Sequence, residues 1–303
     1  MMDVGRHPNI TLLPRSEVIK IQGGPGKFIA TVKTHASYVN WDKCTGCGFC
    51  SEKCPSKIPS EFELMLGKRP AIYKPFPQAV PSKPSIDKAN CIYFKKGKCR
   101  VCEKVCPTEA IDFDMEDTYS DIDVGAVIVA TGIDYFDPTE ASEFGYRRFK
   151  NVVTSFELER LLSAGGPTQG ELIRFTDNKP PKMIAFINCV GSRNMHRDIP
   201  YCSRICCMNA IKDSLIIREY FPDAEIYVFK IDIRAFGKGF EELYNRSLEE
   251  KVKYIKGKPS KVVEDKKTGD LILAHEDQDT GKIEHMQVDM VVLSSALIPA
   301  EGS

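Results

Sequence analysis

The sequence predicts a mixed α/β protein that carries a small cysteine-rich domain as an insertion. The first observation is that strand-like and helix-like segments follow the order β-loop-α-β between Lys182 and Lys230. That order is typical of a nucleotide-binding unit built on a parallel sheet. The second observation is that two runs of cysteines lie between apolar segments with the alternation of β-strands. With 303 residues, the chain is long enough for two domains.

The composition excludes several classes of function. The 42 basic residues balance the 42 acidic ones, so nothing favours binding to nucleic acid or to an anionic membrane surface. No apolar run approaches the roughly 18 to 20 residues that cross a bilayer, and no apolar N-terminal leader is present. The twelve cysteines stand in metal-ligand spacings and not in a small secreted chain. We therefore expect a soluble, cytoplasmic protein of an anaerobe, with no membrane span and no nucleic acid partner.

The first expected element is a β-hairpin. Residues 17–22 and 27–34 alternate apolar and polar side chains around a glycine-rich turn at 23–26. A proline-rich stretch at 74–84 predicts a loop within the cysteine-rich segment. A buried strand is expected from Val124 to Ala130, where the apolar run resumes. Because strands of one sheet would flank the cysteine-rich segment, that segment is predicted to be an insertion.

A second unit is expected to begin near Phe149. Thr154 or Ser155 can cap a short helix over FELERLLSA, which glycines and a proline at 165–167 end. A strand, a long helix and a second strand follow. Four later strands fit a β-meander and a returning strand that close the unit. The predicted ranges are 182–188, 203–220 and 224–230, then 252–255, 260–263, 271–274 and 288–294.

The two cysteine runs have the spacing of ferredoxin clusters. The first run has the pattern C-x2-C-x2-C-x3-C and is followed by Pro55, and the second also ends in Cys-Pro, at Pro107. In the ferredoxin arrangement the first three cysteines of each run bind one [4Fe–4S] cluster and the fourth crosses to the other. Structural zinc is the alternative, but it usually takes two C-x2-C pairs. The predicted ligand sets are Cys44, Cys47, Cys50 and Cys106 for one cluster, and Cys91, Cys99, Cys102 and Cys54 for the other.

A third set, Cys189, Cys202, Cys206 and Cys207, lies where a strand gives way to a helix. A dinucleotide-binding unit carries G-x-G-x-x-G at that point, and only Gly191 is present here. Neighbouring helical residues point about 100° apart, so the helix must begin late or distort for the adjacent cysteines to bind one metal group. The spacing leaves three interpretations open, namely a third cluster, buried structural cysteines, or a thiol/disulfide switch.

The segments CVGSR, YCSRICCMNAIK and IRAFGKGFEE, together with the inserted cysteine runs and an Ala-Thr-Gly turn, closely resemble the A subunit of heterodisulfide reductase. The corresponding subunit of the quinone-interacting oxidoreductase of sulfate reducers is a relative of that family. The resemblance covers nearly the whole chain. It implies a thioredoxin-reductase-like flavoprotein core, here partial, with an inserted bacterial-type two-[4Fe–4S] ferredoxin domain. It also implies that the third cysteine set binds a third [4Fe–4S] cluster near the flavin.

The same resemblance carries an expectation about FAD. Ala130, Thr131 and Gly132 resemble the second FAD-contacting turn of such flavoproteins, whereas the glycine-rich FAD fingerprint of the family is not in this sequence. We therefore expect a fragment or shortened form that lacks the main FAD phosphate site and the C-terminal part. The expected domains are a partial FAD-binding domain over 1–37 and 115–148, a ferredoxin-like domain over 38–114, and an NAD-domain-like unit with the third cysteine set over 149–303.

The resemblance implies an oxidoreductase component that passes electrons between FAD and iron–sulfur clusters. In the family, the partner B and C subunits reduce the CoM–CoB disulfide, and a hydrogenase, a formate dehydrogenase or ferredoxin can take part. No residue here is a candidate for binding that disulfide, and no hydrolase or P-loop motif is present. The alternative function is a flavin-free electron relay within a larger redox complex.

A few other residues have two interpretations. Arg234, Lys238 and Glu241 could face a flavin or a partner, or could simply be solvated around a turn. His196 lies between cysteines of the third set, but four thiols already suffice, so we favour a surface position. Trp41, the single tryptophan, precedes the first cysteine run and is expected to serve packing.

Overall fold

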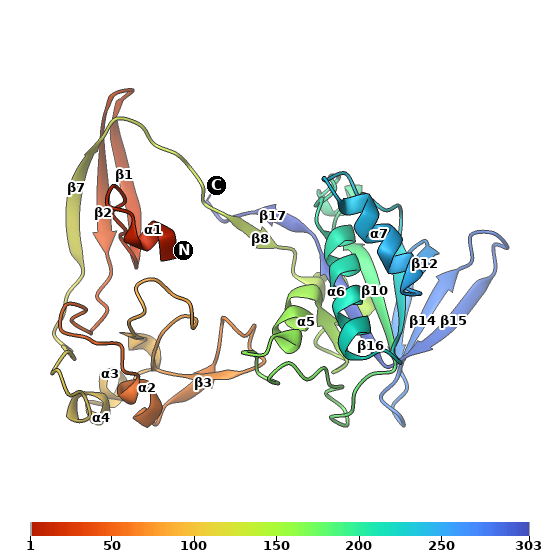
Figure 1. Cartoon of the computed structure of the whole chain (residues 1–303), viewed down its shortest axis with the longest axis horizontal. Coiled ribbons are helices and arrows are strands. Elements are labelled where there is room, and N and C mark those ends of the chain that lie inside the picture. Colours follow the sequence, from red (N-terminus) through yellow and green to blue (C-terminus); the bar gives the residue numbers. More distant parts are fainter. Residues whose placement is uncertain (1, 303) are drawn as a thin grey trace. The chain divides into compact units, whose positions relative to one another are not determined.

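The structure is a computed structural model that describes residues 2–302. The chain divides into two compact units, one up to Ala130 and one from Thr131 (Figure 1). Residues 131–148, which were expected to belong to a partial FAD-binding domain, are part of the second of these units. The functional division into three domains stays a prediction. Among the described residues, no helix has the length and apolar character that a membrane crossing requires.

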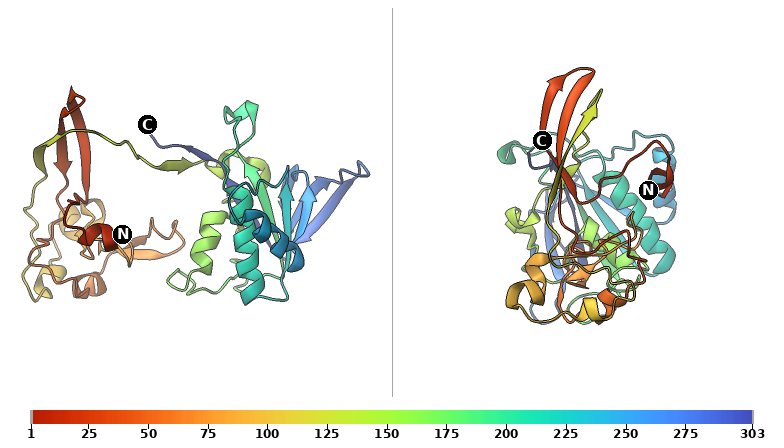
Figure 2. Two further views of the ribbon diagram at one scale, coloured as in Figure 1. Left: turned by 45° about the horizontal axis from the view of Figure 1, so that its top comes forward. Right: turned by 90° about the vertical axis from the view of Figure 1, so that its left-hand side faces the viewer.

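A three-stranded antiparallel sheet frames the first unit. Strands β1 (Ser16–Gly24) and β2 (Lys27–Thr34) form the predicted hairpin, and Gly26 in its turn has a φ of 85° that favours glycine. Strand β7 (Thr118–Val124) then pairs with β2, Val124 lying opposite Phe28 (Figure 2). Strands before and after the cysteine-rich segment therefore share one sheet, which confirms that the segment is an insertion. A short helix, α1 (Met2–Arg6), precedes this sheet.

The expected buried strand over Val124–Ala130 is wrong. The strand of this region ends at Val124, and the apolar residues after it form no strand. Ile128 is 91% exposed and Val129 is 77% exposed. A strand needs a neighbour for its backbone hydrogen bonds, and no strand of the described residues lies beside this segment. An apolar run alone could not reveal that missing neighbour.

The cysteine-rich segment is held by short elements around a small aromatic core. Tyr38, Tyr93, Phe94 and Phe113 pack on one another with ring centroids between 4.2 and 5.7 Å apart. Trp41 contributes to the same core and donates from Nε1 to the Pro84 carbonyl at 2.9 Å, as expected for a packing role. The proline-rich stretch 74–84 is a loop, as predicted. The elements are α2 (Phe49–Lys53), β3 (Lys57–Pro59), β4 (Lys68–Pro70), β5 (Ile72–Tyr73), β6 (Ser85–Ile86), η1 (Lys88–Asn90), α3 (Ile92–Lys96) and α4 (Val101–Lys104).

A five-stranded parallel sheet forms the centre of the second unit and confirms the α/β prediction. Its strands lie in the order β12-β11-β10-β16-β9, and every adjacent pair is parallel. Strands β10 and β16 read as continuous apolar runs because both faces of a central parallel strand are covered. The strands are β9 (Val152–Thr154), β10 (Met183–Val190), β11 (Glu225–Lys230), β12 (Lys253–Lys256) and β16 (Met290–Ser295).

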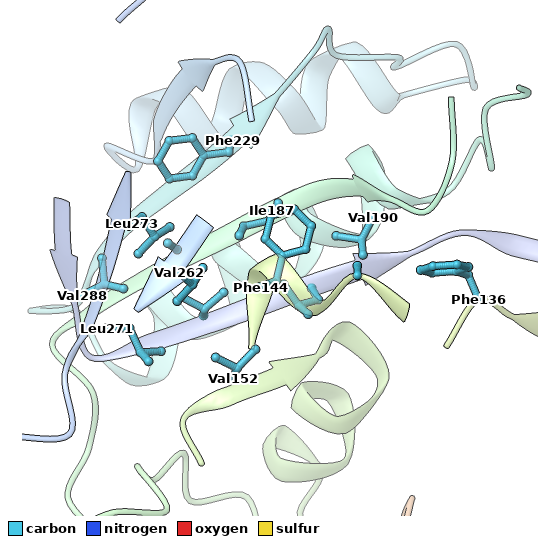
Figure 3. Close-up of a cluster of buried hydrophobic side chains, with 14 of the residues drawn as sticks. Phe136, Phe144, Val152, Ile187, Val190, Phe229, Val262, Leu271, Leu273 and Val288 are labelled. Atoms are coloured by element: carbon cyan, nitrogen blue, oxygen red, sulfur yellow. The ribbon is translucent and has the colours of Figure 1, made fainter. Parts of the chain in front are cut away.

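A β-meander covers one face of the parallel sheet. Figure 3 shows side chains of the meander, such as Leu271 and Leu273, packed with Ile187 and Phe229 of the sheet. Alternation along β10 sends Phe186 to the opposite face, and helices α5 and α6 pack on the sheet strands (Figure 1). The remaining elements are β8 (Ile133–Tyr135), η2 (Pro138–Glu140), η3 (Ser142–Phe144), α5 (Ser155–Leu162), η4 (Met195–Arg197), α6 (Cys206–Tyr220), α7 (Phe240–Glu249), β13 (Lys261–Glu264), β14 (Leu271–Glu276), β15 (Ile283–Val288) and β17 (Leu297–Pro299).

The predicted order of these late elements needs three corrections. The strand expected at 252–255 joins the parallel sheet as β12 and not the meander. The last strand of the meander, β15, was not predicted, because most of its side chains are exposed and its apolar alternation is weak. The long helix begins at Cys206 and not at Ser203, since Arg204 has a φ of 65°, which no right-handed helix accepts.

Helix α5 begins with the capping box that the sequence predicts. Thr154 Oγ1 accepts from Glu157 N at 3.2 Å, and Glu157 Oε2 accepts from Thr154 N at 2.7 Å. Replacing Thr154 with alanine should lower the free energy of unfolding by about 1 kcal/mol, because a buried helix amide loses its acceptor. Urea denaturation of the whole chain measures this, with Ser163→Ala at the other end of α5 as the control. Equal midpoints for the two variants would contradict the assigned cap.

Candidate metal centres

Four cysteines from both ferredoxin-type runs line one cavity of the first unit. Cys44, Cys47 and Cys50 reach it from the loop and first turn around α2, and Cys106 reaches it from just beyond α4. The loop is tight: a Cβ on Gly46 would lie 2.7 Å from the Ser82 carbonyl oxygen. The backbone amides also point at sulfur, Ala110 N lying 3.3 Å from Cys106 Sγ. The cavity encloses about 340 Å³ of space that no atom occupies.

The other four cysteines line a second cavity of the same volume, about 340 Å³. Cys91, Cys99 and Cys102 come from the second run, and Cys54 comes from the end of the first. Cys99 has a φ of 86°, a conformation that a side chain rarely adopts and that a surrounding site must hold in place. In both cavities, therefore, the fourth cysteine of a run lies with the first three of the other run. This is the grouping that the spacing predicted.

Burial makes these thiols poor acids until a metal is present. Burial raises the pKa of the Cys102 thiol to about 12 and also raises the pKa of Cys50. A thiol must lose its proton to bind a metal, so the metal's positive charge supplies the driving force that the protein alone does not. The residues of each cavity thus fit a thiolate-bound cationic group.

The third set lies at the carboxyl edge of the parallel sheet. Cys189 lies near the end of β10, at a bulge where the register with β16 shifts, and its φ is 60°. Cys206 and Cys207 form the first turn of α6, and all three are buried together against Ile233. The late start of the helix therefore brings both adjacent cysteines to Cys189. Ligands of parallel α/β sheets bind at this edge.

Cys202 lies on the loop before α6 and is only half-buried. It lines an open depression together with Arg204, Arg234, Phe236 and other residues. The positive charge of Arg234 is stabilised first by Asp232 and then by Cys202 and Cys189, which raise its pKa. Cys202 is thus a neighbour of the buried trio, although it is not packed among them.

Hydrogen bonds among the trio order their proton affinities. Cys206 shares hydrogen bonds with Cys189 and with Cys207, which raises the pKa of Cys206 and lowers the pKa of the other two. The charge of Lys258 also favours the Cys189 thiolate, and Lys258 Nζ donates to the Cys189 carbonyl at 2.9 Å. Burial lowers the pKa of Lys258 itself. Lys258 had no signal in the sequence, because it is one of many lysines and lies far from the cysteines along the chain.

Buried polar atoms without partners surround Cys189. They belong to Asn188, Ser192, Ser294 and Ser295, and none has a hydrogen-bond partner among the described residues. Ser295 lies beside Val190 in the sheet register, one residue from Cys189. Buried donors of this kind normally find an acceptor. The inorganic sulfides of a cluster bound here would accept hydrogen bonds, so the surroundings fit such a group.

The remaining predicted residues lie outside these centres. Ala130–Gly132 falls in the exposed segment after β7 that forms no strand. Arg234 and Glu241 line the depression beside Cys202, whereas no such role is found for Lys238 among the described residues. His196 is exposed in η4, as expected for a surface position.

Residues 37–60 match the family described as 4Fe-4S binding domain. The matched stretch contains the whole first cysteine run, Cys44 to Cys54. With the two four-cysteine cavities, this match defines an iron–sulfur protein of the 4Fe-4S class.

Curated relatives match the chain along its length. The chain is 45% identical over 306 residues to the A subunit of the H(2):CoB-CoM heterodisulfide,ferredoxin reductase of Methanothermobacter thermautotrophicus, covering 100% of this chain and 45% of that protein. It is 48% identical over 304 residues to the second of the iron-sulfur A subunits of the CoB–CoM heterodisulfide reductase of Methanopyrus kandleri, covering 100% and 46%. The chain belongs to the family of heterodisulfide reductase A subunits. It spans about half the length of the curated relatives it matches.

A more distant member of the same group is the A subunit of the ferredoxin/F(420)H(2)-dependent CoB-CoM heterodisulfide reductase of Methanosarcina acetivorans, 39% identical over 304 residues and covering 100% of this chain and 38% of that protein. Among solved structures, thioredoxin reductase of T. acidophilum covers 61% of this chain and 48% of its own, with 15% identity and a TM-score of 0.33. That likeness is too weak to carry an argument about the core.

Proposed function

We propose that this chain is the electron-transfer part of an iron–sulfur protein of the heterodisulfide reductase type. One observation carries the proposal: two cavities in one small unit, each lined by four cysteines drawn from both runs. Paired [4Fe–4S] clusters supply one-electron chemistry. The chain's part is to hold each group in a closed thiolate cage and to donate backbone hydrogen bonds to the sulfurs, such as Ala110 N to Cys106.

The proposed ligands follow the three groups that the geometry supports. Cys189, Cys206 and Cys207 would bind a third cluster, with Cys202 as the fourth ligand after a small movement of its loop. The full set of proposed ligands is Cys44, Cys47, Cys50 and Cys106; Cys91, Cys99, Cys102 and Cys54; and Cys189, Cys202, Cys206 and Cys207.

We also propose FAD for the family's thioredoxin-reductase-like core, with Ala130, Thr131 and Gly132 as a contact. The support from this chain is limited to open space beside Gly132, where a Cβ would meet no atom within 4 Å. The second candidate function is a flavin-free relay, which the presence of only one of the fingerprint glycines, Gly191, favours. A flavin assay on the purified chain separates the two.

The relatives' names speak of heterodisulfide, ferredoxin, hydrogen or F(420)H(2). We propose that this chain works with the B and C subunits of such a complex, where the CoM–CoB disulfide is reduced, and with a hydrogenase, a formate dehydrogenase or ferredoxin as a further partner. A cytoplasmic location is proposed because all twelve cysteines are free thiols, which a reducing compartment maintains.

The test is metal analysis of the chain purified without oxygen and reconstituted with iron and sulfide. We expect about 12 iron atoms and about 12 acid-labile sulfides per chain for three cubane clusters. A value of about eight would remove the third set, and zinc without iron would overturn the proposal altogether. Adding FAD before gel filtration gives the second readout: a retained flavin absorption band supports the flavoprotein, and its absence supports the relay.

A further inference from the structure

One lysine is built into the third cysteine set. Lys258 lies in the loop between β12 and β13, and its Nζ donates to the Cys189 carbonyl at 2.9 Å. The loop is fixed on both sides of it: Gly257 N donates to the Lys230 carbonyl at 2.8 Å, and Pro259 is buried. The ammonium group is therefore held beside the cysteines and does not extend freely into solvent.

Lys258 has no ion-pair partner among the described residues. The charged side chains around it are matched to one another instead: Arg197 pairs with Glu143 at 3.5 Å, and Arg193 pairs with Asp232 at 2.7 Å. A partly buried ammonium without a counter-charge is costly. The groups that its charge meets are the thiols of Cys189 and Cys206. The site thus carries a fixed positive charge aimed at an anionic occupant, which a four-thiolate cluster is.

We propose that Lys258 is a positioning residue that supplies this counter-charge and raises the reduction potential of the third cluster. The inference rests on the proposed function. When an external reductant gives the cluster one electron, the cluster gains one negative charge and no bond is formed or broken. A nearby cation stabilises the reduced form more than the oxidised form. Lys258 would thereby make this centre a better electron acceptor than its thiolates alone allow.

The test compares Lys258→Met, Lys258→Arg and Lys256→Gln in the full reconstituted chain. Lys256 is exposed two residues earlier and serves as the matched control. Dithionite titrations followed by low-temperature EPR give the potential of each cluster, and the transition that Cys189→Ala abolishes identifies the third one. In Lys258→Met we expect the ratio of reduced to oxidised third cluster at a fixed potential to fall on the order of tenfold. Lys258→Arg and Lys256→Gln should leave it within about twofold of the parent.

The other outcomes decide the matter as well. An unmoved third transition in Lys258→Met overturns the inference while leaving the proposed function intact. If iron falls to about eight in Lys258→Met but stays near about 12 in Lys258→Arg, the charge is needed to retain the cluster and the inference stands. If iron falls in both, Lys258 acts through its shape and the inference is wrong. A parent chain with about eight iron atoms overturns the proposed third cluster and this inference together.

Discussion

Replacing Cys206 with alanine should lower the iron content of the reconstituted chain from about 12 atoms to about eight. Cys206 is buried between Cys189 and Cys207 and shares hydrogen bonds with both. It therefore stands at the centre of the proposed third site, and its loss leaves too few thiolates for a stable cubane. The two ferredoxin-type cavities lie in the other compact unit and should keep their clusters.

The matched control for that variant is Ser214→Ala on the same helix. Ser214 is fully buried and donates from Oγ to the Ala210 carbonyl at 2.6 Å. It loses one heavy atom, as Cys206→Ala does, so both variants should cost about 1 kcal/mol of stability. Only the cysteine variant should lose iron and sulfide. Unchanged iron in Cys206→Ala would show that the trio is structural or a thiol switch, the two interpretations that the spacing left open.

Two double variants should distinguish the crossed ferredoxin grouping from one cluster per run. Cys54 and Cys91 line the same cavity but belong to different runs, whereas Cys47 and Cys54 share a run but line different cavities. Replacing Cys54 and Cys91 together with alanine should remove one cluster and leave about eight iron atoms. Replacing Cys47 and Cys54 together should remove two clusters and leave about four.

The reason is that substitutions within one site are not additive, while those in separate sites are. Single Cys47→Ala, Cys54→Ala and Cys91→Ala variants provide the controls, each with about eight iron atoms. Iron and acid-labile sulfide are measured on the same samples, so that partly assembled clusters are recognised. If the double variant of Cys47 and Cys54 retains as much iron as the double variant of Cys54 and Cys91, the crossed assignment fails.

The cysteine groups could be predicted because ligand spacing is a local property of the chain. The C-x2-C-x2-C pattern places three thiols within one loop and turn, and each partner cysteine follows from the same rule. The parallel sheet was predictable too, since its central strands are continuous apolar runs such as 183–190. The strand expected at Val124–Ala130 failed for the opposite reason: its pairing depends on a neighbour that no apolar pattern specifies.

Residue type and short-range spacing were enough to indicate which residues can bind metal, where strands and helices alternate, and to which family the chain is similar. Two features of the third cysteine set became visible only in the folded chain. Helix α6 begins at Cys206 because the left-handed backbone of Arg204 delays it, and Lys258 faces Cys189. Both features depend on loops that converge at the carboxyl edge of one sheet, and contacts between residues so far apart in the chain leave no periodic pattern in the sequence.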